Sequence, residues 1–154
     1  MLAVRRTGKD TWKHRAAAGV CVVCILYITL LSRTPSADRT VHLVPLWNPF
    51  SEVHWQQVLL NIFMFIPLGY FLAPDFHRIR TCILPAFLLS LAIELAQFFT
   101  YRGMLDTEDI ISNCCGAAIG FLIQKFIGEK VWKDAVSAAM LAAGLIGCII
   151  VSRT

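Results

Sequence analysis

The stretch that decides the fold reads VHWQQVLLNIFMFIPLGYFLAP, residues 53–74, and it places 22 uncharged positions in a row between Glu52 and Asp75. A helix rises about 1.5 Å per residue, so this run is long enough to cross a hydrocarbon core of about 30 Å. It lacks the apolar and polar alternation of a membrane barrel strand. We therefore expect a transmembrane helix over residues 55–73 that ends at Pro74.

Four more blocks of comparable length lie on either side of this run. Two hold 17 and 18 uncharged positions in a row, a third is interrupted only by Glu94, and a fourth holds 15 that a turn at either end extends. An unsatisfied backbone amide in lipid costs several kcal/mol, so a helix is the natural structure for each block. The sequence predicts an all-α, polytopic membrane bundle in a single domain, with five transmembrane helices near residues 16–33, 55–73, 82–100, 107–126 and 135–152.

The composition agrees with a membrane protein. Of the 154 residues, 57% are hydrophobic and only 16% are charged, whereas a soluble domain carries about 25% charged residues. These values disfavour a disordered chain, a coiled coil and a basic nucleic-acid-binding module. The net charge of +4 is explained by lysines and arginines that anchor the helices beside an anionic leaflet, and no nucleic acid is expected as a partner.

The basic residues also predict the orientation. If five helices alternate in direction, ten lysines and arginines fall on the side of the N-terminus and four on the other side. The positive-inside rule then places the N-terminus in the cytoplasm and the C-terminus outside the membrane. We expect the first helix to be an uncleaved anchor, because no small-x-small cleavage pattern follows it.

A long external stretch, residues 34–56, separates the first two predicted helices. It is apolar and aromatic but is interrupted by prolines, so it cannot form a regular spanning helix. Trp47, Phe50 and Trp55 are residue types that settle at the level of the lipid headgroups. The stretch is interpreted as a loop on the membrane surface, with a substrate lid as the alternative.

The cysteines and histidines give no metal-binding pattern. Cys21 and Cys24 lie within a predicted transmembrane helix, where thiols act as small packing residues, and no second pair of ligands accompanies them. His42 and His54 share the external side with several acids, but their spacing fits no ligand pattern. We expect no metal site and no cofactor.

Small residues in the fourth predicted helix favour close helix packing. Gly116 and Gly120 are four positions apart and therefore lie on one face of the helix. We expect this face to contact another helix of the same chain, with dimerisation as the alternative.

Seven polar side chains interrupt or flank the apolar segments. By helical rise, the residues within the predicted helices lie roughly 3 to 10 Å from the external ends. Their spacing of three or four positions places the members of each helix on one face. We expect the seven to converge beneath the external headgroups, while the inner halves of the same helices carry no charge. They are Asn61, Glu94, Gln97, Arg102, Asp106, Asp109 and Asn113.

Three of these residues have both a structural and a functional interpretation. An ionisable group within a transmembrane helix costs at least about 2.5 kcal/mol, so Glu94 is a candidate functional residue, or else it ties the third and fourth helices together through Arg102, Gln97 or Asn113. Asp106 suits a helix N-cap as well as it suits chemistry. Arg102 can hold a carboxylate of the protein or a phosphate of a lipid headgroup.

Two motifs in this polar set resemble a known family. One is the run Asn61-Ile-Phe-Met-Phe-Ile-Pro-Leu-Gly-Tyr70, and the other is Glu94-x2-Gln97-x4-Arg102-x3-Asp106-x2-Asp109-x3-Asn113-x2-Gly116-x3-Gly120. The chain resembles the VanZ-like family of small polytopic membrane proteins, whose founding members are associated with teicoplanin resistance. The loop here reads Leu-Val-Pro-Leu at residues 43–46, where the family more often has Ile-Pro-Phe.

The resemblance implies an organisation and a site. Residues 39–127 would form the core that bears the motifs, residues 1–15 a basic cytoplasmic tail, and residues 135–152 an additional helix with no motif to compare. The family's polar signature falls on the seven polar residues named above. Membership implies a multi-pass protein of the cell envelope without an agreed reaction.

Two classes of function fit these features. In the first, the protein binds or modulates a lipid-linked or anionic surface component at the outer leaflet. In the second, it is a membrane-embedded hydrolase or transferase that acts on an envelope lipid, with Glu94 or Asp109 as general base and Arg102 as electrophile. A path for protons or cations is disfavoured because no polar relay continues through the inner halves of the helices. We expect membrane lipids as partners, and the oligomeric state is open.

Overall fold

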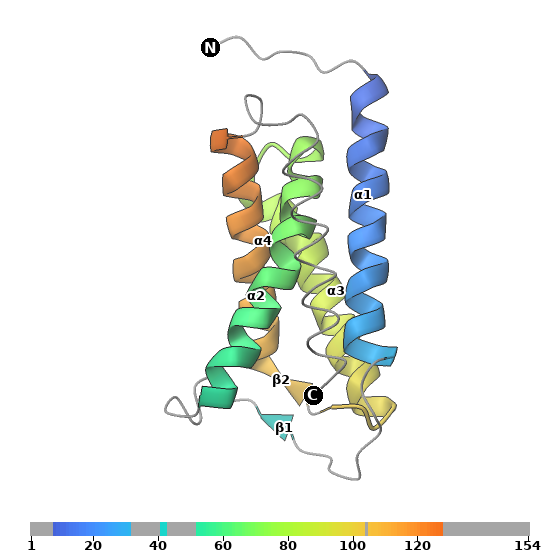
Figure 1. Cartoon of the computed structure of the whole chain (residues 1–154), viewed down its shortest axis with the longest axis vertical. Helices are drawn as coiled ribbons and strands as arrows, with labels where there is room; N and C mark the ends of the chain where they lie inside the picture. The colour runs from blue at the N-terminus through green and yellow to red at the C-terminus, as the bar shows by residue number, and fades with distance from the viewer. Residues whose placement is uncertain (1–7, 32–40, 43–51, 104, 128–154) are drawn as a thin grey trace.

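The structure, a computed structural model, describes residues 8–31, 41–42, 52–103 and 105–127 (Figure 1). Four long helices dominate this part of the chain: α1 (Gly8–Leu26), α2 (Glu52–Leu72), α3 (Ile79–Phe99) and α4 (Thr107–Ile127). A π-helical turn, η1 (Tyr27–Leu31), continues α1, and a 3-10 turn, η2 (Ala73–Asp75), follows α2. The prediction of a helical bundle is confirmed.

Three segments of the described chain are long and apolar enough to cross a membrane. They are Trp12–Leu31, Trp55–Asp75 and Ile79–Phe99, which match the first three predicted helices. α4 occupies the fourth predicted position and has 21 residues, but acids in its first turn make its beginning polar. The fifth predicted helix, residues 135–152, lies outside the described residues, as does most of the external loop.

Prolines set or interrupt the helices as their chemistry requires. Pro74 follows the end of α2 at Leu72, as predicted. It is the second residue of η2, where a backbone N–H has no partner within the turn and its absence costs little. α3 begins at Ile79, three residues before the predicted start at residue 82. Pro85 therefore lies in the second turn of α3, where it removes one backbone N–H from the helix.

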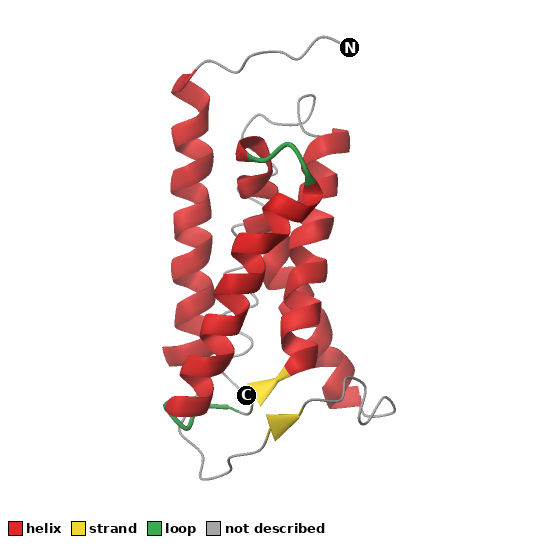
Figure 2. Ribbon diagram, turned by 180° about the vertical axis from the view of Figure 1, so that it is seen from behind, coloured by secondary structure: helices red, strands yellow, loops and turns green. Residues whose placement is uncertain are grey.

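The four helices alternate in direction, so each end of the bundle gathers the ends of all four (Figure 1). At one end, the Arg15 guanidinium of α1 pairs with the Asp75 carboxylate of η2 at 3.0 Å. At the other end, two strands of two residues each, β1 (Val41–His42) and β2 (Leu105–Asp106), pair in parallel. Figure 2 shows them in yellow, as the only strands in the described part of the chain. This pairing was not predicted, because two residues give no period that a sequence pattern can reveal.

Glycines bring α2 and α4 into close contact. A Cβ atom on Gly120 would lie 2.0 Å from the Ile66 carbonyl oxygen, and one on Gly116 would lie 2.3 Å from that of Ile62. Gly69 of α2 faces the backbone of Ala117 in the same way. The prediction that Gly116 and Gly120 pack within the bundle is confirmed.

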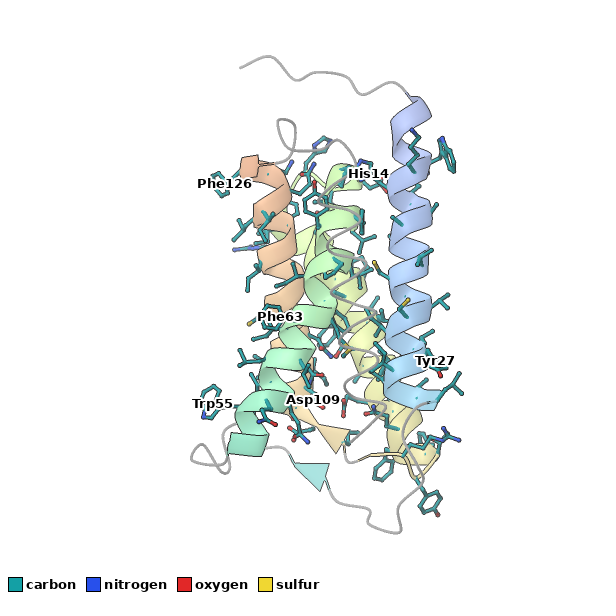
Figure 3. The ribbon with its side chains drawn as sticks, viewed as in Figure 1. His14, Tyr27, Trp55, Phe63, Asp109 and Phe126 are labelled. Atoms are coloured by element: carbon teal, nitrogen blue, oxygen red, sulfur yellow. The ribbon has the colours of Figure 1, made fainter. Side chains whose placement is uncertain are left out.

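The apolar side chains divide between a packed interior and a lipid-facing exterior. Phe65, Leu68 and Phe71 of α2 lie in the interior with Ile25 of α1 and Ala117 of α4. Large side chains such as Phe63 and Phe126 point outward and are mostly exposed (Figure 3). An exposed apolar exterior of this kind suits a lipid surround and would be costly in water.

Candidate functional site

Glu94 is a carboxylate in the interior of the helical bundle. It lies near the C-terminal end of α3 and is only 2% exposed. Its Oε2 atom accepts a hydrogen bond from the backbone N–H of Asp106 at 2.8 Å. The carboxylate therefore joins α3 to β2 at the start of α4, and a charge-assisted bond of this kind offsets part of its desolvation cost.

Asp106 caps the helix that it precedes. Its Oδ1 atom accepts a hydrogen bond from the backbone N–H of Glu108 at 2.9 Å. Asp106 immediately precedes α4, so this is the bond of an N-cap residue, which satisfies one of the free amides of the first turn. Asp106 thus has the N-cap role that the sequence predicts as one of its two interpretations.

Asn61 and Asp109 connect α2 to α4. The side-chain nitrogen of Asn61 donates to Oδ1 of Asp109 at 2.7 Å, although the two residues are 48 positions apart in the sequence. Asn61 is buried and Asp109 is half-buried. Asp109 is labelled in Figure 3, where it lies toward the end of the bundle that carries the two strands.

Gln97 and Asn113 are buried amides. In each, the side-chain nitrogen donates a hydrogen bond, whereas the side-chain oxygen accepts none from the described residues. The nitrogen of Gln97 donates to the backbone carbonyl of Thr29 at 2.9 Å, and the nitrogen of Asn113 donates to the hydroxyl of Ser90 at 2.8 Å. Within the described residues, no donor reaches Gln97 Oε1 or Asn113 Oδ1. A buried acceptor without a donor costs about 1 to 3 kcal/mol.

Arg102 is held at the end of α1. Its guanidinium donates to the backbone carbonyls of Leu30 and Leu31, which lie in the π-helical turn η1. The last carbonyls of a helix lack intrahelical donors, so a cation here satisfies them and opposes the helix dipole. Arg102 therefore fastens the end of α3 to the end of α1.

The backbone that carries Arg102 is unusual. α3 ends at Phe99, and Tyr101 adopts a φ of 58°, in the left-handed region that favours glycine. The N–H of Arg102 then bonds to the carbonyl of Gln97 at 2.9 Å, as in a Schellman motif. This turn redirects the chain and places the guanidinium over η1.

The polar cluster, as we name this group, comprises the seven predicted residues and lies at the end of the bundle that carries β1 and β2. Four of its members are buried, namely Asn61, Glu94, Gln97 and Asn113, and three are half-buried, namely Arg102, Asp106 and Asp109. Glu108 is also half-buried at this end. Together with Glu94, Asp106 and Asp109 it makes four carboxylates beside the one guanidinium of Arg102.

Two further residues of this end escaped the sequence analysis. Ser90 is completely buried and bonds to Asn113, and Thr29 supplies the carbonyl that Gln97 uses. Ser90 lies four positions before Glu94 and thus on the same helix face, a spacing that could have revealed it. Thr29 contributes only a backbone atom, which no side-chain pattern can indicate.

The opposite end of the bundle is not entirely apolar. Gln124 of α4 is buried, although the sequence analysis noted only that this half carries no charge. No group of three His, Cys, Asp or Glu side chains in the described ranges is close enough to hold a metal ion. Cys21 and Cys24 are both free thiols in α1.

Comparison with known proteins places these features in a family. The model of the family described as VanZ/LLP1 matches residues 19–128, which include α2, α3 and α4 and the C-terminal part of α1. The chain belongs to the VanZ/LLP1 family. The prediction made from the two motifs is confirmed.

A curated VanZ/LLP1 relative is "Protein VanZ" of Enterococcus faecium. It is 26% identical to this chain over 104 residues, which cover 64% of this chain and 63% of that protein. The match thus spans less than two thirds of the relative's length. No solved structure matches this chain.

Proposed function

We propose that this protein binds or modulates a lipid-linked or anionic component of the cell envelope at the outer leaflet, and that the polar cluster is its binding site. The observation that carries the proposal is the Glu94 carboxylate, 2% exposed inside an apolar bundle. An ionisable group in such a place is costly, and in membrane proteins it commonly marks a functional site.

The contacts of the polar cluster favour binding over catalysis. A general acid or base must reach a proton of the substrate at about 3 Å. Asp106 caps α4, Asp109 accepts from Asn61, and the guanidinium of Arg102 bonds to carbonyls of η1. Side chains that are held by such hydrogen bonds can give a binding site a fixed shape, whereas a general acid or base must be free to exchange a proton with the substrate.

The orientation is part of this proposal. We infer that the N-terminus is cytoplasmic and that five helices cross the membrane, which would put the polar cluster under the outer leaflet. The end with the Arg15–Asp75 ion pair also carries Arg78 and Arg80, and basic residues favour the cytoplasmic side. A role in sensitivity to glycopeptides such as teicoplanin, which act outside the cell, belongs to the same proposal.

Lipids that remain with the purified protein test the proposed function. We would extract the full chain from membranes in mild detergent and identify retained lipids by mass, for the wild type, Glu94→Gln and the control Gln124→Met. Glu94→Gln removes the charge at nearly constant volume, and Gln124→Met alters a buried amide at the other end of the bundle. Glu94→Gln is expected to lose at least about tenfold of the retained lipid, in line with the loss of one charged hydrogen bond.

The same preparation separates binding from catalysis. Incubation with envelope lipids should leave their masses unchanged. A new product that forms with the wild type but not with Glu94→Gln would assign a hydrolase or transferase to the polar cluster. Equal lipid retention by the wild type and a folded Glu94→Gln would reject the proposed site.

A further inference from the structure

The end of the bundle where α1 begins and α4 ends lies opposite the polar cluster (Figure 1) and carries an excess of positive charge. Asp75 is engaged there, because its two oxygens accept from the Arg15 guanidinium at 3.0 and 3.3 Å. Lys9 and Asp10 are adjacent in α1 and offset one another. The field at this end therefore attracts a negatively charged partner. Four further cations pair with no carboxylate of the described residues, namely Lys13, Arg78, Arg80 and Lys125.

Two of these cations lie at the beginning of α3, and packing brings a third to the same place. Arg78 immediately precedes α3 and Arg80 is its second residue, and both side chains are exposed. Phe121 of α4 packs in one apolar cluster with Cys82 of α3. The Nζ atom of Lys125 lies 5.4 Å from the centroid of the Phe121 ring. Lys125 is therefore held beside the beginning of α3.

A row of exposed apolar side chains continues from Arg80 along α3. Leu84 and Leu88 follow Arg80 at intervals of four, so the three residues lie on one face of the helix. Both leucines are more than half exposed, at 56% and 54%, and the row runs about 12 Å from the cation into a segment that is apolar enough to cross a membrane. An acidic protein segment would match the cation but not the leucines. A phospholipid matches both, because its acyl chains extend below its phosphate.

We propose that this face of α3, which we name the Arg80 stripe (Arg80, Leu84 and Leu88), binds an anionic phospholipid. The lipid phosphate would pair with Arg80, and an acyl chain would lie along the two leucines. Arg78 and Lys125 would add to the positive potential around the phosphate. A phospholipid without net charge should bind more weakly, because its ammonium group opposes this potential. The proposal does not rest on the proposed function, since the stripe begins at the other end of α3 from the polar cluster.

Two lipids that differ in headgroup charge test the proposal. The full chain is reconstituted in nanodiscs with equal amounts of phosphatidylglycerol and phosphatidylcholine of matched acyl chains, and the lipids still bound after mild detergent are counted by native mass spectrometry. We expect phosphatidylglycerol to be retained at least about fivefold over phosphatidylcholine, and Arg80→Gln to lower its retention about fivefold, the effect of one cation near a membrane surface. Lys13→Gln is the matched control. It removes one charge from the same end, but from α1, and should retain phosphatidylglycerol as the wild type does.

Three results would overturn the proposal. They are equal retention of the two lipids by the wild type, a phosphatidylglycerol preference that folded Arg80→Gln keeps, and equal losses from Arg80→Gln and Lys13→Gln. Equal losses would show a general attraction by surface charge and no site on α3. If Arg80→Gln does not fold, Arg78→Gln takes its place with the same expected direction.

A competition experiment tests the part played by the leucines. Soluble glycerol 3-phosphate in excess should leave phosphatidylglycerol bound, because it lacks the acyl chain that contacts Leu84 and Leu88. Complete displacement would show that a phosphate alone suffices and would overturn a lipid site. Lipid that remains on Arg80→Gln can belong to the polar cluster, so a comparison of Glu94→Gln in that background tests the proposed function separately.

Discussion

At the scale of single residues, the polar cluster combines side chains that stabilise helix ends with side chains that keep a buried oxygen without a hydrogen-bond donor. Asp106 and Arg102 satisfy helix ends, whereas Gln97 and Asn113 each keep one oxygen without a donor in the described chain. Side chains of one cluster therefore differ in purpose, and substitutions should separate them by their effects on stability and on ligand retention.

Arg102 gives the clearest separation. Arg102→Met removes the bonds to Leu30 and Leu31 while it keeps an apolar stem, and we expect it to lower the stability of the folded protein by about 1.5 to 3 kcal/mol. Arg102→Lys keeps the charge and should recover part of this loss. Thermal unfolding in detergent measures both.

The opposite result would change the interpretation of Arg102. If Arg102→Met unfolds at the wild-type temperature but retains much less lipid, the guanidinium serves the ligand and not the end of α1. That outcome would favour the phosphate-binding alternative for this residue.

The sequence predicted the members of the polar cluster but not their partners. Spacing of three and four residues placed Glu94 with Gln97, and Asp109 with Asn113, on common faces. It could not show that Glu94 bonds to a backbone amide, or that Gln97 and Arg102 reach carbonyls of η1, because backbone atoms leave no trace in side-chain patterns.

At the scale of helices, glycine determines how closely α2 and α4 approach. The prediction from Gly116 and Gly120 succeeded because small residues four positions apart make a flat face on any helix. The partner helix could not be predicted, since α2 offers Gly69 and main-chain carbonyls that no motif distinguishes. The π-helical turn η1 and the strand pair were likewise missed, because each depends on contacts far along the chain.

Gly120→Ala should disrupt this contact. Its new methyl group would lie 2.0 Å from the Ile66 carbonyl oxygen, so α2 and α4 must move apart, at an expected cost of about 1 to 3 kcal/mol in unfolding free energy. Gly19→Ala is the matched control, because nothing lies within 4 Å of its added atom. This control should stabilise α1 by up to about 1 kcal/mol.

Chemical or thermal unfolding of both variants in the same detergent checks this prediction. Equal effects of the two substitutions would mean that α2 and α4 are farther apart than described. A larger loss for Gly19→Ala would contradict the packing outright.

At the scale of the whole molecule, the proposal depends on which end of the bundle faces the outside. Hydropathy predicted the first three apolar helices closely, because a run without charges is a strong signal. It predicted α4 by position, although acids and amides in the first two turns of α4 make its beginning polar. Those polar residues are the ones that contribute to the polar cluster.

Reporter fusions test the proposed topology. A phosphatase that is active only outside the cytoplasm should be active when fused after residue 103 or residue 154 and inactive after residue 77. A fluorescent reporter that matures only in the cytoplasm serves as the inverse control. Activity after residue 77 would reverse the orientation, and a cytoplasmic residue 154 would contradict five crossings.

The most direct test of the central claim is to map where a ligand touches the protein. A lipid with a photoreactive headgroup is incorporated with the full chain in nanodiscs, irradiated, and its attachment sites are located by peptide mass spectrometry. The account predicts labels concentrated on residues 91–113, around Glu94 and Asp109, with labelling reduced in Glu94→Gln. Labels spread evenly over both ends of the bundle, or confined to outward side chains such as Phe63, would contradict it.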